Sequence, residues 1–382
     1  MAIDYGKISS PKQRGKILLQ TRNLKMTRNA HAYVRGSTVK FYEWLEDGGR
    51  KLPGGPPVWI CGDCHVGNLG PLADADGHVD LQIRDLDQTV IGNPLHDLVR
   101  LALSLASAAR GSDLPGVTTA RMLEEMMNGY EAALAGRFGG EMEKSRRPKL
   151  IRVILDRAVR RKWRQLAEER IENVKPTIPR GKRFWALSKR ETKALKDLVK
   201  SDGARELITA LKGRHGDDKI EMLDAAYWMK GCSSLGRLRY AVLLGVADGE
   251  PDANNLCLLD VKEGVLAAAP RARGAKMPRD NAERVVAGAR ALSPNLGERM
   301  MAARLFDKSV TVRELMPQDL KIEIPQLSRE GATAIAGYLA GVVGRAHARQ
   351  MDGATRRSWK AELARNRSKN AGRTFMALGE RG

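Results

Sequence analysis

Several residue types are scarce in this chain, and each scarcity argues against a class of protein. Phe, Trp and Tyr together make up 5% of the 382 residues, which disfavours a surface that stacks nucleic-acid bases on aromatic rings. Four cysteines are too few for a disulfide-stapled scaffold. No run of about 18 apolar residues occurs, so the sequence predicts no membrane-spanning helix.

Acidic residues are in the minority, with 45 Asp and Glu against 66 Lys and Arg and a net charge of +21. This excess favours polyanionic partners such as nucleic acid, anionic lipid or phosphorylated substrates. The chain is longer than the usual domain with a single hydrophobic core, so two lobes are expected. Its hydrophobic content of 42% is enough for packed cores. The opening residues, Met-Ala-Ile-Asp-Tyr-Gly-Lys, lack the apolar segment of a secretion signal, so we expect a cytoplasmic protein.

The most informative stretch begins with a short apolar segment, Val58 to Ile60, which predicts a strand. A turn rich in hydrogen-bonding side chains follows, containing Asp63, His65 and Asn68 separated by glycines. Loops at strand ends often carry catalytic groups. His65 fits a role in bracing this loop better than a role as a base.

A second predicted strand, residues 79–83, ends in Asp85 and Asp87. Two strand ends would then deliver carboxylates and an amide toward one place, which suits a hard cation such as Mg²⁺. Asp87 is either a second metal contact or a helix-cap partner. The alternative interpretation of the whole stretch is a hairpin whose Asp and Asn residues only stabilise turns.

Cys61-Gly-Asp-Cys64 has the C-x-x-C spacing of zinc and redox sites. No second pair of cysteines or histidines completes a zinc set. The alternative is a pair of small buried thiols.

Two segments carry dense positive charge. Residues 144–170 hold eleven Lys or Arg against three acids, and apolar residues recur there at helical spacing, which predicts an amphipathic helix with a basic face. Residues 354–382 are also basic and of low hydrophobicity. Either face is simply solvated or contacts a polyanion such as nucleic acid. Further helices are predicted over residues 95–105, 116–134 and 188–211.

The pattern changes near residue 222, where strands become frequent. Two predicted strands flank a glycine-rich turn at residues 231–236, and a third strand, 255–261, leads to Lys262. A helix with Glu283 in its first turns, a strand over 309–315 and a long helix over 331–348 follow.

These parts can form one phosphate-handling site. A glycine-rich turn lets backbone N–H groups approach phosphate oxygens, and Lys262 can reach the same oxygens as a point charge. Glu283 would hold Lys262 in an ion pair. Asp63 would then orient or accept the proton of a nucleophile, while Asn68 and Asp85 bind the metal.

Two motifs carry a resemblance to known families. Cys61-Gly-Asp-Cys-His-Val-Gly-Asn68 resembles the H-G-D-x-H-x-x-N catalytic loop of the aminoglycoside-phosphotransferase branch of the protein-kinase-like fold. The segment from Asp85 to Asp97 resembles the metal-aspartate segment of that branch, with the same spacing to the helix aspartate.

The chain as a whole, over about residues 25–352, resembles the family called domain of unknown function 2252. That family carries G-D-x-H-x-x-N, D-F-D-E-T, G-x-G-S-x-G, V-K-E-A and A-H-A-R. The last four appear here as Asp85-Leu-Asp-Gln-Thr89, Gly231-Cys-Ser-Ser-Leu-Gly236, Val261-Lys-Glu-Gly264 and Ala346-His-Ala-Arg349.

The resemblance implies Asp63 as the catalytic base in a loop that includes His65. It implies Asn68 and Asp85 as Mg²⁺ ligands, and Asp97 as a structural brace behind the loop. The residues from Val312 to Met316 would form the strand and hinge that meet the adenine of ATP. The positions implied at the nucleotide are Gly231, Ser233, Ser234, Gly236, Lys262, Glu283, Glu314 and Met316.

The implied fold is α+β and protein-kinase-like, with a helical C-lobe and a small antiparallel-sheet N-lobe connected in permuted order, since the catalytic loop precedes the glycine turn. The expected divisions are a helical lobe with the catalytic and metal loops over 1–215, a β-rich nucleotide lobe over 216–325, and a returning helix with a basic tail over 326–382.

The function implied is ATP- and Mg²⁺-dependent transfer of a phosphoryl group to an unknown acceptor, with nucleotidyl transfer as a variant. A basic face would suit an acidic acceptor. One rival is a nucleic-acid-binding protein with an inactive kinase-like site. Another is a metal-dependent hydrolase that uses Asp63, His65, Asp85, Asp87 and His96.

Overall fold

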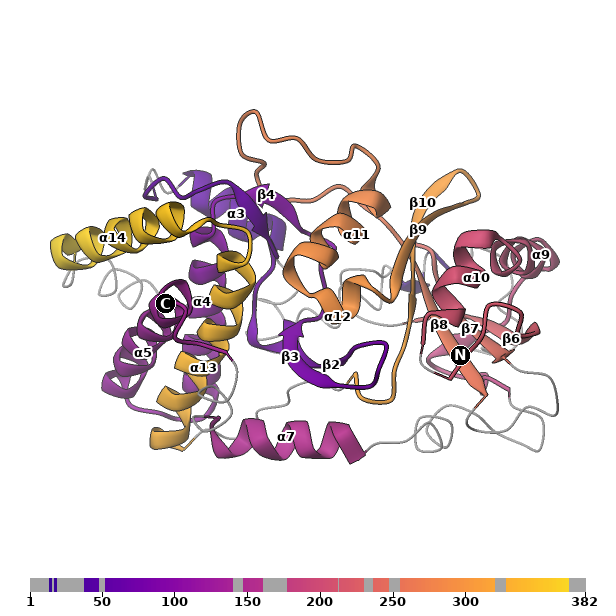
Figure 1. Cartoon of the computed structure of the whole chain (residues 1–382), viewed down its shortest axis with the longest axis horizontal. Coiled ribbons are helices and arrows are strands. Elements are labelled where there is room, and N and C mark those ends of the chain that lie inside the picture. Colours follow the sequence, from indigo (N-terminus) through magenta and orange to yellow (C-terminus); the bar gives the residue numbers. More distant parts are fainter. Residues whose placement is uncertain are drawn as a thin grey trace.

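The computed structural model describes residues 14–15, 17–18, 38–47, 52–139, 147–160, 177–211, 213–229, 236–246, 255–319 and 328–370. Helices and antiparallel strands both contribute, which confirms the predicted α+β class. Figure 1 shows long helices gathered at one end of the molecule and a sheet at the other, with a shorter helix pair between them.

The helical end is built around three long helices whose apolar sides form the largest core. The first of them begins at Leu95 as predicted, with Asp97 in its first turn, and the second matches the predicted residues 116–134. The helices of this end are α3 (Thr38–Asp47), α4 (Leu95–Gly111), α5 (Gly116–Leu134), α7 (Lys149–Arg160), α13 (Arg329–Ala348) and α14 (Gly353–Asn370).

Helices α5 and α13 cross at glycines, which allows their backbones to touch. A β-carbon at Gly129 would lie 1.9 Å from the carbonyl oxygen of Gly337, a distance that no side chain can adopt. Farther along, a β-carbon at Gly344 would lie 2.9 Å from the carbonyl oxygen of Tyr130. The close approach seats α13 where its last turn reaches the loop that follows Ile60.

Replacing Gly129 with alanine is therefore expected to lower the free energy of unfolding by about 1–3 kcal/mol, because the two helices must separate to admit the methyl group. Urea titration followed by circular dichroism measures the change. Gly116→Ala on the same helix is the control, since nothing lies within 4 Å of a β-carbon there. Equal stability of the two variants would contradict the packing argument.

The sheet end contains six antiparallel strands in the order β5-β6-β7-β8-β10-β9. Side chains alternate between its two faces, and each face has an apolar cluster of its own. The strands are β5 (Phe184–Trp185), β6 (Ile220–Trp228), β7 (Arg239–Val246), β8 (Leu256–Glu263), β9 (Met300–Leu305) and β10 (Lys308–Glu314).

Helices α9 (Lys189–Val199) and α10 (Asp202–Thr209) cover one face of this sheet. They replace the single helix predicted over 188–211, because Ser201 caps a new helix with its hydroxyl. Their apolar sides belong to the core of the sheet. The predicted boundary at residue 215 thus separates two helices from the sheet on which they pack.

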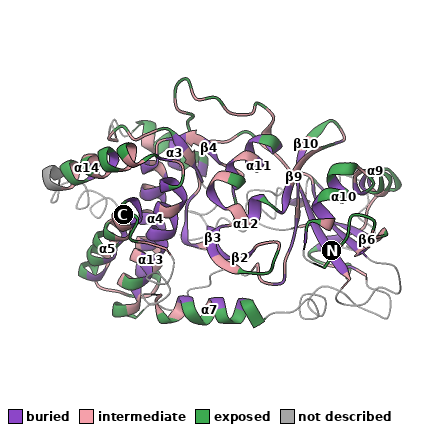
Figure 2. Ribbon diagram, viewed as in Figure 1, coloured by how far each residue is buried: buried purple, intermediate pink, exposed green. Residues whose placement is uncertain are grey.

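Between the two ends lie two small two-stranded sheets and the helices α11 (Asn281–Leu292) and α12 (Pro294–Gly297). The apolar side of α11 contributes to the helical core, and α11 also contacts β9 and β10. Figure 2 shows that buried residues concentrate where these parts meet. One sheet pairs β1 (Val58–Ile60) with β4 (Val90–Gly92), and the other is the hairpin of β2 (Leu69–Ala73) and β3 (Val79–Ile83). The 3-10 helix η1 (Val66–Asn68) precedes β2.

None of the helices in the ranges given above has both the length and the apolar character needed to cross a bilayer.

Candidate functional site

The buried carboxylate of Asp97 fixes the turn after β1 through backbone hydrogen bonds. Asp97 accepts hydrogen bonds from the backbone N–H groups of Cys61 at 2.7 Å and Gly62 at 2.9 Å. The Tyr42 hydroxyl donates to the Gly62 carbonyl at 2.8 Å. Asp97 therefore has the bracing position that the resemblance implied, and the next residue, Asp63, is held at a defined place.

Asp63 is partly buried and pairs with one cation. The Arg100 Nε donates to its Oδ1 at 2.9 Å, and the Arg100 side chain is only 2% exposed. Burial raises the pKa of Asp63 to about 6, against the lowering effect of Arg100. A carboxylate whose pKa lies near neutral pH is suited to accept a proton from a nucleophile.

Asn68 joins the two acidic loops. Its Nδ2 donates to the backbone carbonyls of Asp63 at 2.9 Å and of Asp85 at 3.4 Å. These bonds use the donor end of the amide and leave the Oδ1 end for a ligand. An amide oxygen beside a carboxylate is the kind of hard donor set that Mg²⁺ prefers, so Asn68 and Asp85 fit the implied ion.

Lys262 lies against both aspartates of the second loop. Its Nζ is 3.4 Å from Asp85 Oδ1 and also pairs with Asp87 Oδ2. Burial opposes the ionisation of Asp85, yet the charge of Lys262, followed by those of Arg239 and Arg313, holds the pKa of Asp85 well below its usual value. The Asp85 side chain is 48% exposed, whereas Lys262 is 12% exposed. Asp85 is thus ionised and accessible to a cation from solvent.

Two further arginines surround Lys262, and the sequence did not single them out. Arg239 is paired with Lys262 in the strand register, and it forms a buried ion pair with Asp260 in which Nη2 and Oδ2 are 2.6 Å apart. Arg313 Nε is 3.6 Å from the same Asp260 oxygen. The signal that could have found them is alternation along the strands, because residues two apart share a face.

The predicted ion pair between Lys262 and Glu283 does not form. Glu283 is exposed on the first turn of α11, where its backbone N–H donates to the cap residue Asp280. The two loop aspartates already neutralise Lys262. The neighbouring Arg284 is the residue that ties α11 to the metal-aspartate loop, through the carbonyls of Asp87 and Thr89.

The predicted hinge residues lie at the end of β10, and their backbone groups are engaged within the protein. The Glu314 N–H donates to the Arg299 carbonyl at 3.2 Å, and the Glu314 carboxylate pairs with Arg214 at 2.9 Å. The Met316 N–H donates to Asp319 Oδ2 at 3.3 Å. Of the predicted glycine turn, Gly236 is exposed with φ +93°, and Gly231, Ser233 and Ser234 lie outside the described residues.

Both cysteines of the C-x-x-C segment are buried in the helical core and carry no disulfide. The hydrogen bond to Cys64, then burial, raises the pKa of the Cys61 thiol well above its usual value. Burial also raises the pKa of Cys64, against the lowering effect of its bond to Cys61. This environment matches the alternative of inert buried thiols rather than zinc or redox chemistry.

Cys61 and Cys64 are accordingly expected to resist iodoacetamide at pH 8 in the native protein and to react once urea unfolds the chain. Peptide mass spectrometry after timed quenching reports each site separately. Rapid native alkylation of either thiol would contradict the inert interpretation.

The histidines have structural surroundings. His65 is buried at the start of η1, where its side chain makes no capping hydrogen bond. His347 on α13 is buried, with Nε2 3.1 Å from Asp97 Oδ2 and Nδ1 3.0 Å from the Tyr130 hydroxyl. The ring of His96 packs edge-on against Tyr42.

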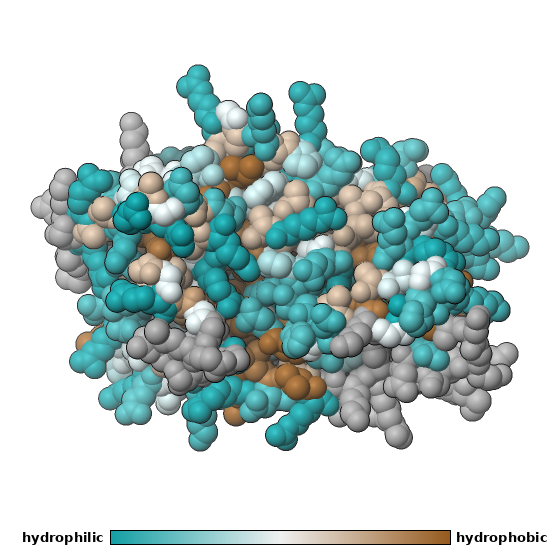
Figure 3. Space-filling view, in the orientation of Figure 1, coloured by the Kyte–Doolittle hydropathy of each residue, from teal (hydrophilic) through white to brown (hydrophobic). Residues whose placement is uncertain are grey.

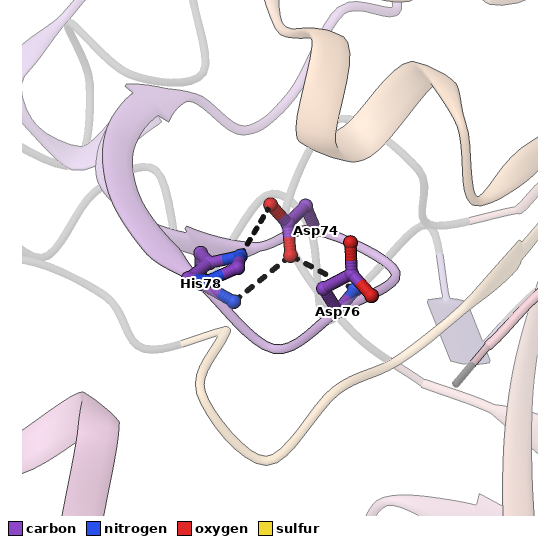
Figure 4. A group of neighbouring side chains, drawn as sticks. All are labelled: Asp74, Asp76 and His78. Carbon is purple, nitrogen blue, oxygen red and sulfur yellow. Dashed lines mark hydrogen bonds and ion pairs between the residues drawn. The ribbon is translucent and has the colours of Figure 1, made fainter. Parts of the chain in front are cut away.

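One group of acidic and histidine side chains does come together, at the turn between β2 and β3 (Figure 4). Asp74, Asp76 and His78 have ligand atoms within 4.8 Å of one another, and they are the only such group found in the described part of the chain. The Asp74 carboxylate accepts the backbone N–H groups of Asp76 and His78, as in a turn-forming aspartate. The hydrolase set of Asp63, His65, Asp85, Asp87 and His96 does not assemble in this way.

Residues 147–160 are the described part of the basic segment 144–170, the rest of which lies outside the described residues. Within them helix α7 presents its charged side chains to solvent. Ile151, Leu155 and Ala158 are buried, while Arg152, Arg157 and Arg160 are exposed. Figure 3 shows hydrophilic side chains over much of the face in view, including the lower edge where α7 runs. On α14, Arg367 is within 4 Å of Glu124 and Glu131 of α5, so part of that charge is neutralised.

These features define an α+β protein in which a lysine of an antiparallel sheet contacts the loop of Asp85 and Asp87, and Asn68 joins that loop to the loop of Asp63. The family described as "Uncharacterized protein conserved in bacteria (DUF2252)" matches residues 14–376, so the chain belongs to that family. No curated protein and no solved structure gives a significant match.

Proposed function

We propose that this protein is an ATP- and Mg²⁺-dependent phosphotransferase of kinase-like, two-lobed fold, with its lobes connected in permuted order. The observation that carries the proposal is the contact of Lys262 with Asp85 and Asp87. A strand lysine and the metal aspartate come from segments 177 residues apart, and phosphoryl transfer requires them at one triphosphate.

The strand order supports the same proposal. The glycine turn connects β6 to β7, Lys262 lies on the next strand, β8, and α11 follows before β9 and β10. This is the succession of glycine loop, strand lysine and helix that protein kinases use. Asp63 lies in the loop that Asp97 and Arg100 of α4 hold, and Asn68 of the same loop donates to the Asp85 carbonyl.

In this mechanism the oxygen of an acceptor hydroxyl attacks the γ-phosphorus, and the bond to the β–γ bridging oxygen breaks as ADP leaves. Asp63 accepts the hydroxyl proton, for which its pKa of about 6 is suitable. Lys262 would exchange Asp85 for phosphate oxygens, which frees Asp85 for the metal. Asn68 and Asp85 would hold Mg²⁺, which when bound neutralises charge on the phosphates.

The hydrolase alternative has no use for a lysine between its carboxylates. A second candidate function, nucleic-acid binding, is favoured by one observation, the exposed arginines of α7. A nucleic-acid-binding protein with an inactive site would show binding that weakens steeply with salt. Replacing Asp85 would leave that binding unchanged.

Calorimetric titration of the full chain with ATP, with and without Mg²⁺, tests the proposal. We expect Mg²⁺-dependent binding that weakens about tenfold or more in Lys262→Met, because a charge-assisted contact is lost. Asp85→Asn should remove the Mg²⁺ dependence.

Lys308→Met is the matched control, since Lys308 is an exposed strand lysine that pairs only with Glu263 among the described residues. Absence of ATP binding at millimolar concentration in the wild type would refute the phosphotransferase proposal.

A further inference from the structure

The backbone N–H groups of the three residues from Glu314 to Met316, at the end of β10, are all engaged within the protein. From Glu314 onward the N–H groups donate, in order, to the Arg299 carbonyl at 3.2 Å, the Leu258 carbonyl at 2.9 Å and Asp319 Oδ2 at 3.3 Å. The next residue is Pro317, which has no N–H. A purine base recognised by this segment would need a backbone N–H group that donates a hydrogen bond to one of its ring nitrogens.

Two carbonyls of the segment are engaged as well. The Glu314 carbonyl accepts from Arg299 Nη1 at 2.7 Å, and the Met316 carbonyl accepts from the Asp319 N–H at 3.0 Å. Arg299 and Asp319 form an ion pair at 3.0 Å whose side chains are 1% and 3% exposed. Breaking a buried ion pair costs several kcal/mol, on the order of 3–5, so a ligand would not displace these bonds.

The sheet face beside Lys262 is charged where a heterocycle would need apolar contact. Arg239 and Thr311 oppose Lys262 on the two neighbouring strands, and Arg313 opposes Asp260. Cross-strand partners share a face, and the ion pairs of Asp260 with Arg239 and Arg313 agree with this register. A base is normally held between apolar surfaces.

The apolar part of this face is already covered. Ala241, Leu243 and Leu258 continue the face away from Lys262, and all three are buried in one cluster with Ile178 and Trp228. Near Asp85 the face presents Lys262, whereas Arg239 and Arg313 are ion-paired with Asp260. The ammonium group of a lysine suits phosphate oxygens through charge-assisted hydrogen bonds.

We propose that the site recognises its phosphoryl donor through the triphosphate and not through the base. The inference rests on the proposed function and specifies its donor class as compounds that carry a Mg²⁺-bound triphosphate. ATP, GTP and inorganic triphosphate should then bind at the same place with similar strength. Lys262 carries the recognition.

Calorimetric titration of the full chain with the Mg²⁺ complexes of ATP, GTP and inorganic triphosphate tests this proposal. The dissociation constants should agree within about threefold. Lys262→Met should weaken all three ligands by a common factor of about ten or more, whereas Lys308→Met should leave them unchanged.

Two results would overturn the inference, and only the second would also refute the phosphotransferase proposal. ATP binding about tenfold or more tighter than both GTP and triphosphate, and lost in Lys262→Met, would show a base-reading site and leave the phosphotransferase proposal intact. No binding of any of the three ligands at millimolar concentration would refute both proposals.

Discussion

Asp63→Asn is expected to slow phosphate release from Mg²⁺-ATP by about 10²–10⁴-fold, the usual worth of a general base. This assay measures transfer of the phosphoryl group to water, so the natural acceptor need not be known. The attacking water must lose a proton, and in the proposed mechanism Asp63 accepts it. The asparagine oxygen can still accept the bond from Arg100 Nε, which now spans 2.9 Å. ATP affinity should therefore change by less than about threefold.

The pH dependence gives a second, independent sign of the role of Asp63. Only the ionised carboxylate can accept a proton, so the wild-type rate should rise with pH through about 6, the value to which burial raises the pKa of Asp63. Below that pH the protonated form accumulates and the rate falls. The asparagine variant should lack this acidic limb.

Asp76→Asn serves as the matched control, because Asp76 is an exposed aspartate at the turn between β2 and β3. Its rate and pH profile should equal those of the wild type. A normal rate in Asp63→Asn, or a loss explained wholly by weaker ATP binding, would remove Asp63 from the chemistry.

The sequence was sufficient for those parts of the site that depend on local spacing. Asp63 and Asn68 follow a short strand within one motif, and the interval from Asp85 to Asp97 is fixed by a loop and a helix start. Local geometry of this kind survives in the fold because few other conformations satisfy the same turn and cap residues. The contact between Lys262 and Asp85 was predicted from the order of the motifs in the family that the chain resembles.

The parts that failed depend on pairings between distant segments. Arg239 and Arg313 join the site only because β7, β8 and β10 pair in one particular register. Glu283 was chosen as the lysine partner by analogy, although two aspartates lie closer. The boundary at 215 stays a prediction. The apolar stripes of α9 and α10 indicate that these helices are covered but do not indicate which surface covers them.

Asp97→Ala is expected to have the largest effect on stability, lowering the free energy of unfolding by about 3–5 kcal/mol. The carboxylate accepts two backbone N–H groups from the Asp63 loop and faces His347, and it is fully buried. Its removal leaves donors buried without acceptors. Urea titration measures the loss, and Asp97→Asn should lie between alanine and wild type because one acceptor oxygen remains.

Asp156→Ala is the control for Asp97, since this aspartate is exposed on α7 and its loss should change stability by no more than about 0.5 kcal/mol. The Asp97 variants should also release phosphate more slowly under conditions where they remain folded, because the loop that carries Asp63 and Asn68 is no longer held against α4 and α13. Stability equal to that of Asp156→Ala would mean that Tyr42 and Asn68 suffice to hold the loop. In that case α13 would have no part in ordering the site.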